Sequence, residues 1–221
     1  MSQDDPLVAS LPAVAQLSLV YAPASARQPT LALLALDARL ATLIRRSSEP
    51  MLAQLRLAWW RESIAQSPQT WPEGEPILAA LRSWGSRHAD AQVLVDAWEA
   101  MTAPSPLGAD AMSKFAEGRG AACAVLARVL GCARDEQAAM TLGQIWGAED
   151  LATRLGRDDE RALAATVADA QPRKLPRVSR PLRSLRVLAG LTRRRRVSGS
   201  EAGAASPAAV LEALKLGLLG L

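Results

Sequence analysis

The acidic side chains bear most directly on the chemistry that this 221-residue chain could perform. Two aspartates four positions apart on a helix share one face and can hold Mg²⁺, which prefers oxygen ligands in octahedral geometry. None of the 22 acidic residues has another acid four positions after it. Asp37 is followed at that distance by Ala41, and Asp150 by Arg154. The sequence therefore predicts no metal site built from paired carboxylates on one helix.

Other residue types that commonly build reactive or metal-binding sites are scarce. Two cysteines, Cys123 and Cys132, and one histidine, His88, are too few for a disulfide framework or a zinc site. The N-terminal residues do not combine a basic region with an apolar core, so we expect no secretory signal. Charges interrupt every apolar run before it reaches the length that crosses a bilayer. We therefore expect a cytoplasmic protein that needs no cofactor.

The composition favours helices throughout. Hydrophobic residues make up 49% of the chain, yet Tyr and Phe occur once each. No run rich in β-branched or aromatic residues is long enough to form a strand, which predicts an all-α, single-domain helical bundle. The abundance of Ala, Arg, Gly and Pro is typical of a GC-rich bacterial genome. We predict a helical domain over residues 1–196, a flexible linker over 197–207 and an amphipathic helix over 208–221.

The stretch Thr30–Ile64 predicts two helices, separated by a break at Arg46–Pro50. Pro50 falls just inside the second helix, where its missing N–H costs nothing. Each helix carries an apolar stripe at helical spacing: Leu33, Leu36, Leu40 and Leu43 in the first, and Leu52, Leu55 and Trp59 in the second. Further helices are predicted over Ile77–Trp84, Asp90–Met101, Asp110–Leu130, Asp135–Leu155 and Pro181–Arg196.

The segment Glu49–Ile64, EPMLAQLRLAWWRESI, resembles the hallmark helix of the squalene/phytoene synthase family, in which Glu-Pro precedes Trp-Trp-Arg. Three later segments resemble the family more weakly but in the right order: Phe115–Gly131, Thr141–Leu155 and Arg173–Arg186. The resemblance implies the all-α isoprenoid-synthase fold. It also implies, for active members, Mg²⁺-dependent head-to-head joining of two prenyl diphosphates.

At the positions of the family's two aspartate motifs, this chain keeps Asp37 on one side and Glu149 and Asp150 on the other. We interpret these three as remnants, because neither side keeps two acids four positions apart, and such sides are a poor cradle for a metal–diphosphate cluster. The chain resembles the motif-degenerate branch that includes the mitochondrial NADH dehydrogenase (complex I) assembly factor. The sequence therefore favours a non-catalytic module that binds a prenyl or other lipid ligand or a protein partner, with a role in membrane-complex assembly. The alternative is an active prenyltransferase that uses Mg²⁺ at an unusual site.

Two residues of the hallmark helix are candidates for ligand binding. Arg56 could pair with a diphosphate, or form an ion pair with Asp37 or Glu62. Trp60 could line a prenyl cavity, whereas Trp59 is expected in the core, because neighbouring residues point about 100° apart on a helix. Asp37 itself is expected to be the buried partner of an arginine.

A basic stretch is the strongest signal outside the resemblance. Ten of the 26 Lys and Arg residues lie between Arg173 and Arg196, with no acid among them. This pattern is typical of a helix on an anionic membrane surface, with a solvated arginine tail as the alternative. No nucleic-acid-binding motif accompanies it, so no nucleic-acid partner is expected. We expect a peripheral location at the inner face of the membrane, with these candidate contacts: Arg183, Arg186, Arg193, Arg194, Arg195 and Arg196.

Overall fold

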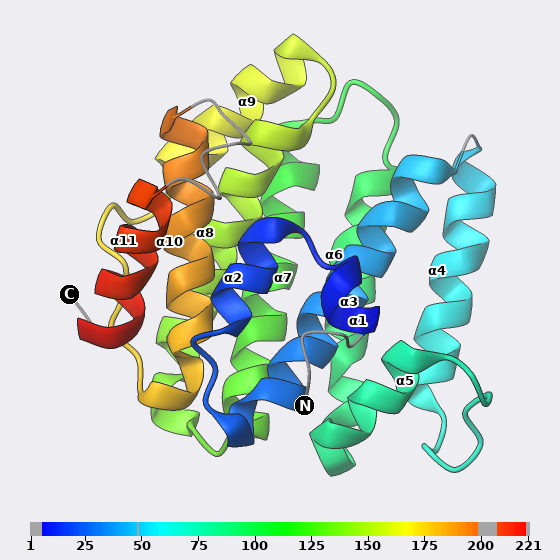
Figure 1. Ribbon diagram of the computed structural model, residues 1–221. Helices are drawn as coiled ribbons and strands as arrows, with labels where there is room; N and C mark the ends of the chain where they lie inside the picture. The colour runs from blue at the N-terminus through cyan, green and yellow to red at the C-terminus, as the bar shows by residue number, and fades with distance from the viewer. Residues whose placement is uncertain (1–5, 48, 199–206, 220–221) are drawn as a thin grey trace.

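The computed structural model describes residues 6–47, 49–198 and 207–219, and these form a bundle of helices with no strand among them (Figure 1). The all-α prediction is confirmed. The first half of the chain comprises α1 (Pro6–Ser10), α2 (Ala13–Leu19), α3 (Ala24–Arg46), α4 (Pro50–Ala65), α5 (Pro76–Leu81), η1 (Arg82–Ala91), α6 (Gln92–Glu99) and η2 (Ala100–Thr102). The second half comprises α7 (Ala109–Val129), η3 (Ala133–Asp135), α8 (Glu136–Arg154), α9 (Asp158–Asp169), η4 (Arg180–Leu182), α10 (Arg183–Ser198), α11 (Pro207–Leu214) and η6 (Lys215–Leu219).

Helices α7 and α8 lie side by side at the centre of the bundle and pack unusually closely (Figure 1). The turn after α7 includes Gly131, whose φ of 69° is a left-handed conformation that glycine adopts without strain. A Cβ atom added to Gly143 of α8 would lie 2.6 Å from the carbonyl oxygen of Arg119 in α7. One added to Gly147 would lie 2.8 Å from the Cα of Ala116. Glycine at these positions therefore lets the two backbones approach.

The first predicted helix corresponds to α3, which crosses the core. Its leucine stripe is buried as predicted, with Leu33, Leu36 and Leu40 each 0% exposed. Asp37 lies within this buried stretch and is only 6% exposed. The buried face of α3 therefore places a carboxylate in the interior, among its leucines.

Helix α4 begins at Pro50 as predicted, but the predicted apolar stripe is not the buried one. The residues that face the core are Ala53, Leu57, Trp60 and Ile64. Three others, Leu52, Leu55 and Trp59, are between 41% and 62% exposed. The helix carries apolar residues on two faces, and only one face can pack against the bundle.

Helix α10 lies inside the bundle, between α8 on one side and α2 and α11 on the other (Figure 1). Arg186 is only 6% exposed, and a Cβ added to Gly190 would lie 2.3 Å from Leu216 in η6. Arg186, one of the predicted membrane contacts, is therefore buried, and the C-terminal segment lies against Gly190 one turn further along the helix.

The C-terminal segment follows the predicted helix only in part. Its buried residues include Ala213 and Leu216, whereas Leu211 and Leu214 of the predicted stripe are 54% and 39% exposed. The side chain of Leu218 and all of Leu221 lie outside the described residues. Of the predicted linker, residues 197 and 198 belong to α10, residue 207 begins α11, and residues 199–206 lie outside the described residues.

Candidate functional site

Arg119 of α7 joins the two aspartates that stand at the motif positions. Its Nε and Nη2 donate to Oδ1 and Oδ2 of Asp37 at 2.9 and 2.7 Å. Its Nη1 donates to Oδ2 of Asp150 at 3.1 Å. The planar guanidinium suits this arrangement, because its fixed fork of donors matches a carboxylate in two-point contact. One arginine therefore bridges α3 and α8 through the centre of the bundle.

The bridge is enclosed by aromatic rings. The Cζ of Arg119 lies 4.5 Å from the ring centre of Phe115 and 4.1 Å from that of Trp146. Trp98 of α6 adds a third ring at 5.2 Å and donates its Nε1–H to Oδ1 of Asp37 at 2.9 Å. Cation–π contacts of this kind gain strength where water is excluded, and Arg119 is 1% exposed. The surroundings thus stabilise a charge that would be costly to bury alone.

Local sequence patterns explain how these side chains meet. Phe115, Arg119, Ala122 and Leu126 recur at three- and four-residue spacing, so they lie on the same face of α7. All four are buried. Asp150 lies seven residues after Gly143 on α8, which turns it towards the same face of α7. The glycines of the α7–α8 contact bring the two helices close enough for Arg119 to reach it.

The charges in this cluster affect one another. Burial raises the pKa of the Asp37 carboxyl above its ordinary value, with Asp150 adding to the rise while Arg119 and Trp98 oppose it. Burial alone would lower the pKa of the Arg119 guanidinium, but the two carboxylates raise it above its ordinary value. Arg119 is therefore a fixed cation, held in place by the two aspartates.

The geometry leaves these aspartates poorly suited to Mg²⁺. Both oxygens of Asp37 already accept hydrogen bonds from Arg119. Asp150 is engaged by Arg119 through Oδ2 and by Arg154 through Oδ1, the latter at 2.6 Å. Within the described ranges, no three His, Cys, Asp or Glu side chains are grouped so that they could hold a metal. The cationic guanidinium lies between the carboxylates, so the residues present do not fit the family's metal.

Glu149, the third predicted remnant, lies elsewhere. It is 1% exposed and accepts hydrogen bonds from Arg193, at 2.8 Å, and from Arg196. Arg196 also contacts Asp169 of α9 at 2.7 Å. This second ion-pair cluster ties α8, α9 and α10 together, and it explains why part of the arginine run is not free to face a membrane.

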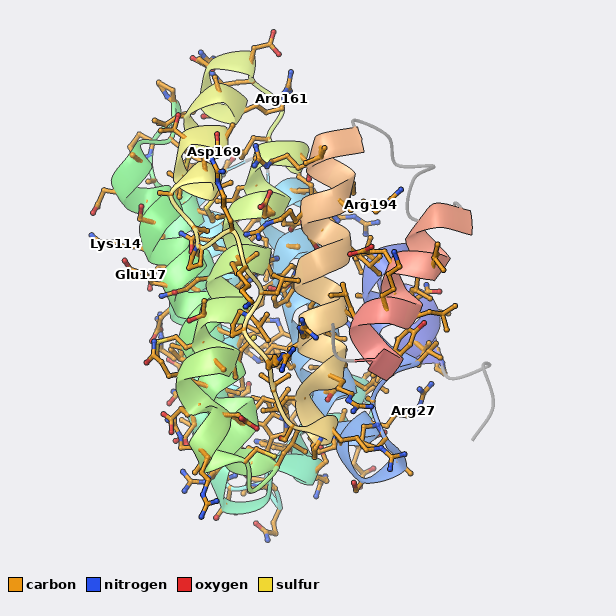
Figure 2. All side chains as sticks on the ribbon, turned by 90° about the vertical axis from the view of Figure 1, so that its left-hand side faces the viewer. Arg27, Lys114, Glu117, Arg161, Asp169 and Arg194 are labelled. Atoms are coloured by element: carbon orange, nitrogen blue, oxygen red, sulfur yellow. The ribbon has the colours of Figure 1, made fainter. Side chains whose placement is uncertain are left out.

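The remaining arginines of the run also lie outside one common face. Arg183 donates to the carbonyl oxygen of Gly217 at 3.3 Å. Arg194 projects from the side of α10 that is turned away from α8 (Figure 2). Arg195 lines the cavities beside Asp150. The six predicted membrane contacts thus point in several directions.

Two adjoining cavities open beside the Arg119 cluster. Both are lined by Ala41, Arg45, Asp150, Arg154 and Arg195. The inner one is narrow, about 70 Å³, and reaches Asp37 and Arg119. The outer one measures about 350 Å³, and its apolar walls are Ile44, Trp98, Met101, Leu151 and Leu155. The combination is a cationic mouth next to an apolar pocket.

The ligand candidates of the hallmark helix lie away from these cavities. Arg56 is exposed, and its Nη1 lies 3.5 Å from Oγ of Ser47, so neither predicted acidic partner is used. Trp60 is 3% exposed and Trp59 is 44% exposed, which reverses the expectation for this pair. Both rings and Arg56 line a separate groove between α3 and α4.

The sequence analysis did not identify Arg119, although its spacing from neighbouring apolar residues indicated a buried position. It lies four residues after Phe115 and three before Ala122, so the sequence places it on the same helical face as these two apolar residues. A buried arginine requires an acidic partner. Arg119 was therefore a visible candidate for the arginine that Asp37 was expected to pair with.

Comparison with known proteins places the chain in a family. A sequence model described as squalene/phytoene synthase matches residues 15–164, which is more than half of the chain. That range includes α3, α4, α7 and α8, and so all three residues of the Arg119 cluster. No curated protein and no solved structure matches significantly. On the family match, together with the helical bundle, the chain belongs to the squalene/phytoene synthase family.

Proposed function

We propose that this chain is a non-catalytic member of its family that binds an anionic lipid without a metal ion. The observation that carries this proposal is the bridge from Arg119 to Asp37 and Asp150. A fixed cation occupies the space between the carboxylates, where a divalent cation would have to compete with it. Removing Arg119 from that position would break a buried ion pair, which is energetically unfavourable.

The cavities support the lipid-binding part of the proposal. Arg45 and Arg154 offer guanidinium donors at the mouth, and guanidinium groups recognise phosphate and carboxylate oxygens by paired hydrogen bonds. The apolar outer cavity lies in the volume range of ligand pockets, which begins at about 300 Å³. An anionic head group with an apolar chain, such as a prenyl phosphate, matches both parts. A role for this module in assembling a membrane complex rests on the resemblance of the hallmark helix.

One observation favours the alternative, an active Mg²⁺-dependent prenyltransferase. Asp37 and Asp150 line the same cavity, as a pair of metal-binding aspartates would. Activity would require Arg119 to leave both carboxylates when substrate and metal arrive. The two functions therefore predict different effects of Mg²⁺: the alternative requires it for product formation, whereas the proposed function binds its lipid without it.

The test measures binding and product formation in parallel. Farnesyl diphosphate is added to the purified protein in EDTA and in Mg²⁺, and thermal unfolding is followed. We expect a similar rise in Tm in both buffers, a smaller rise with Arg45→Gln and Arg154→Gln, and no rise with farnesol, which lacks the charged head. Arg87→Gln, an exposed arginine outside the cavity lining, is the matched control.

The same samples, incubated with radiolabelled farnesyl or geranylgeranyl diphosphate and Mg²⁺, should yield no coupled product. A Mg²⁺-dependent coupled product that is lost in Asp37→Asn would establish the alternative. A Tm that does not respond to farnesyl diphosphate in either buffer would refute lipid binding at this pocket.

A further inference from the structure

Helix α4 exposes an apolar face that the bundle leaves uncovered. Four large apolar side chains share it: Met51, Leu52, Leu55 and Trp59, which are 70%, 41%, 62% and 44% exposed. They lie within about 100° of helical arc, given the 100° turn between successive residues. Scattered exposed apolar residues are ordinary, but a contiguous patch of this kind marks an interaction surface.

The position of α4 leaves this face accessible. Helix α4 lies at the right-hand edge of the bundle in Figure 1, on the side opposite α10 and α11. Its buried residues pack inward, and Trp60 meets Trp59 edge to face at 5.1 Å between ring centres. The ring of Trp59 therefore packs against a core residue, Trp60, while it remains partly exposed itself.

Basic residues border the apolar face along its α3 side. Arg39, Arg46 and Arg56 line the groove between α3 and α4, about 300 Å³ in volume, together with both tryptophans. Arg46 and Arg56 are exposed, while Arg39 pairs with Glu75 at 3.6 Å. The acidic residues of the helix itself lie at its two ends, with Glu49 as the N-cap and Glu62 in the last turn. Positive charge therefore lies next to the middle of the apolar stripe.

We propose that the α4 face, defined by Met51, Leu52, Leu55 and Trp59 with Arg46 and Arg56, docks onto an anionic lipid bilayer surface. A helix with an apolar face lies in the interfacial region with that face inserted, and adjacent arginines contact the lipid phosphates. Tryptophan favours this region because its ring is apolar and its N–H is polar. The surface lies apart from the Arg119 cavities, so the proposal is independent of the proposed function.

Binding to vesicles tests the proposal with the whole chain. The protein is floated with vesicles of phosphatidylcholine alone and of equimolar phosphatidylcholine and phosphatidylglycerol. We expect binding to the anionic vesicles that weakens as salt is added. The variant Met51→Ser/Leu55→Ser/Trp59→Ser should bind roughly tenfold more weakly or worse, because each change removes inserted apolar area.

Two control variants separate the α4 face from the rest of the molecule. Val20→Ser/Leu211→Ser removes exposed apolar residues elsewhere and should bind as the parent protein does. Arg46→Gln/Arg56→Gln should weaken anionic binding more than Arg173→Gln/Lys174→Gln, which removes the same charge from another exposed segment. Circular dichroism should show all variants folded, because the altered side chains are exposed.

Three outcomes would overturn the proposal. The protein could bind neither kind of vesicle. It could bind with an affinity that the α4 variants leave unchanged, which would place the contact elsewhere. Finally, light scattering could show a dimer that the α4 triple variant dissociates, without any vesicle binding, which would assign the face to a second copy of the chain.

Discussion

Arg119 and Asp37 are 82 residues apart in the sequence and form a two-point ion pair in the centre of the bundle. Both are almost fully buried, and Asp150 completes the cluster from the neighbouring helix. Burying three charged groups is costly, and the cost is offset only while all three remain paired. The stability of the fold should therefore depend on the cluster being either complete or fully replaced.

Removing Arg119 alone should be strongly destabilising. In Arg119→Met the Asp37 carboxylate remains buried without a counter-charge and Asp150 keeps only Arg154, so we expect a loss of about 3–5 kcal/mol in the free energy of unfolding. Urea unfolding measures it. The triple variant Asp37→Asn/Arg119→Met/Asp150→Asn contains no buried charge at this position and should lose less than the single one. A triple variant that is less stable than Arg119→Met would show that packing, and not charge, dominates here.

The effect of Arg119→Met should also depend on pH. Burial raises the pKa of Asp37, so the folded state keeps that proton to a higher pH than the unfolded chain, whose aspartates titrate near about 3.9. The stability that this proton contributes is fully present below the unfolded pKa and is lost as pH rises through the folded pKa. Without the guanidinium, which opposes the rise, the folded pKa of Asp37 should move higher still.

The stability gap between the parent protein and Arg119→Met should therefore widen over the pH range above the unfolded aspartate pKa of about 3.9. Urea unfolding across that range gives the gap at each pH. Adding Asp37→Asn to the variant removes the titrating group and should flatten the profile. A gap that is constant across the range would contradict the assignment of the effect to buried carboxylates.

The approach of α7 and α8 should be sensitive to a single methyl group. Gly→Ala within a helix ordinarily stabilises by about 1 kcal/mol. At Gly143 the new Cβ would meet the carbonyl oxygen of Arg119 at 2.6 Å and Sγ of Cys123 at 2.8 Å. We expect Gly143→Ala to destabilise by about 1–3 kcal/mol instead, because the helices must separate.

Thermal unfolding compares this variant with Gly156→Ala, where no atom lies within 4 Å of the added Cβ. The control should lie close to the parent protein. If Gly143→Ala were stabilising, the α7–α8 contact would have room to relax, and the close approach would not be what positions Arg119.

The helices could be predicted because their signals are local. Pro50 began α4, Gly131 followed α7, and the leucine stripe of α3 was buried as expected. The sequence of α4 alone could not show which of its two apolar stripes is buried. It depends on which face meets α3 and α6, and that is fixed by the packing of the whole bundle.

The candidate site could be predicted only in part. Asp37 was expected to be the buried partner of an arginine, and it is. Which arginine could not be read from spacing, because Arg56 and Arg119 both lie on helices other than α3, and their distance from Asp37 depends on how the helices pack. The ion pairs of Arg193 and Arg196 could not be predicted, because a basic run resembles a surface helix until its buried partner, Glu149, is known.

The two cysteines should differ sharply in reactivity. Burial raises the pKa of the Cys123 thiol to about 12, and its side chain lies in the α7–α8 contact. Almost none of it is thiolate near neutral pH, and the thiolate is the reactive form. Cys132 is only partly buried and lies in the turn between the two helices. A disulfide-exchange reagent should therefore modify Cys132 in the folded protein and Cys123 only after unfolding.

The reagent 5,5′-dithiobis(2-nitrobenzoic acid) reports this by absorbance. The folded parent protein should release one equivalent quickly and the second only in urea. Cys132→Ser should release none until it unfolds, whereas Cys123→Ser should keep the fast phase. Because Cys123 lies against Gly143, its rate of modification also reports how often α7 and α8 separate. A fast reaction of Cys123 in folded Cys132→Ser would mean that this contact opens readily, and that Arg119 is held less firmly than its ion pairs imply.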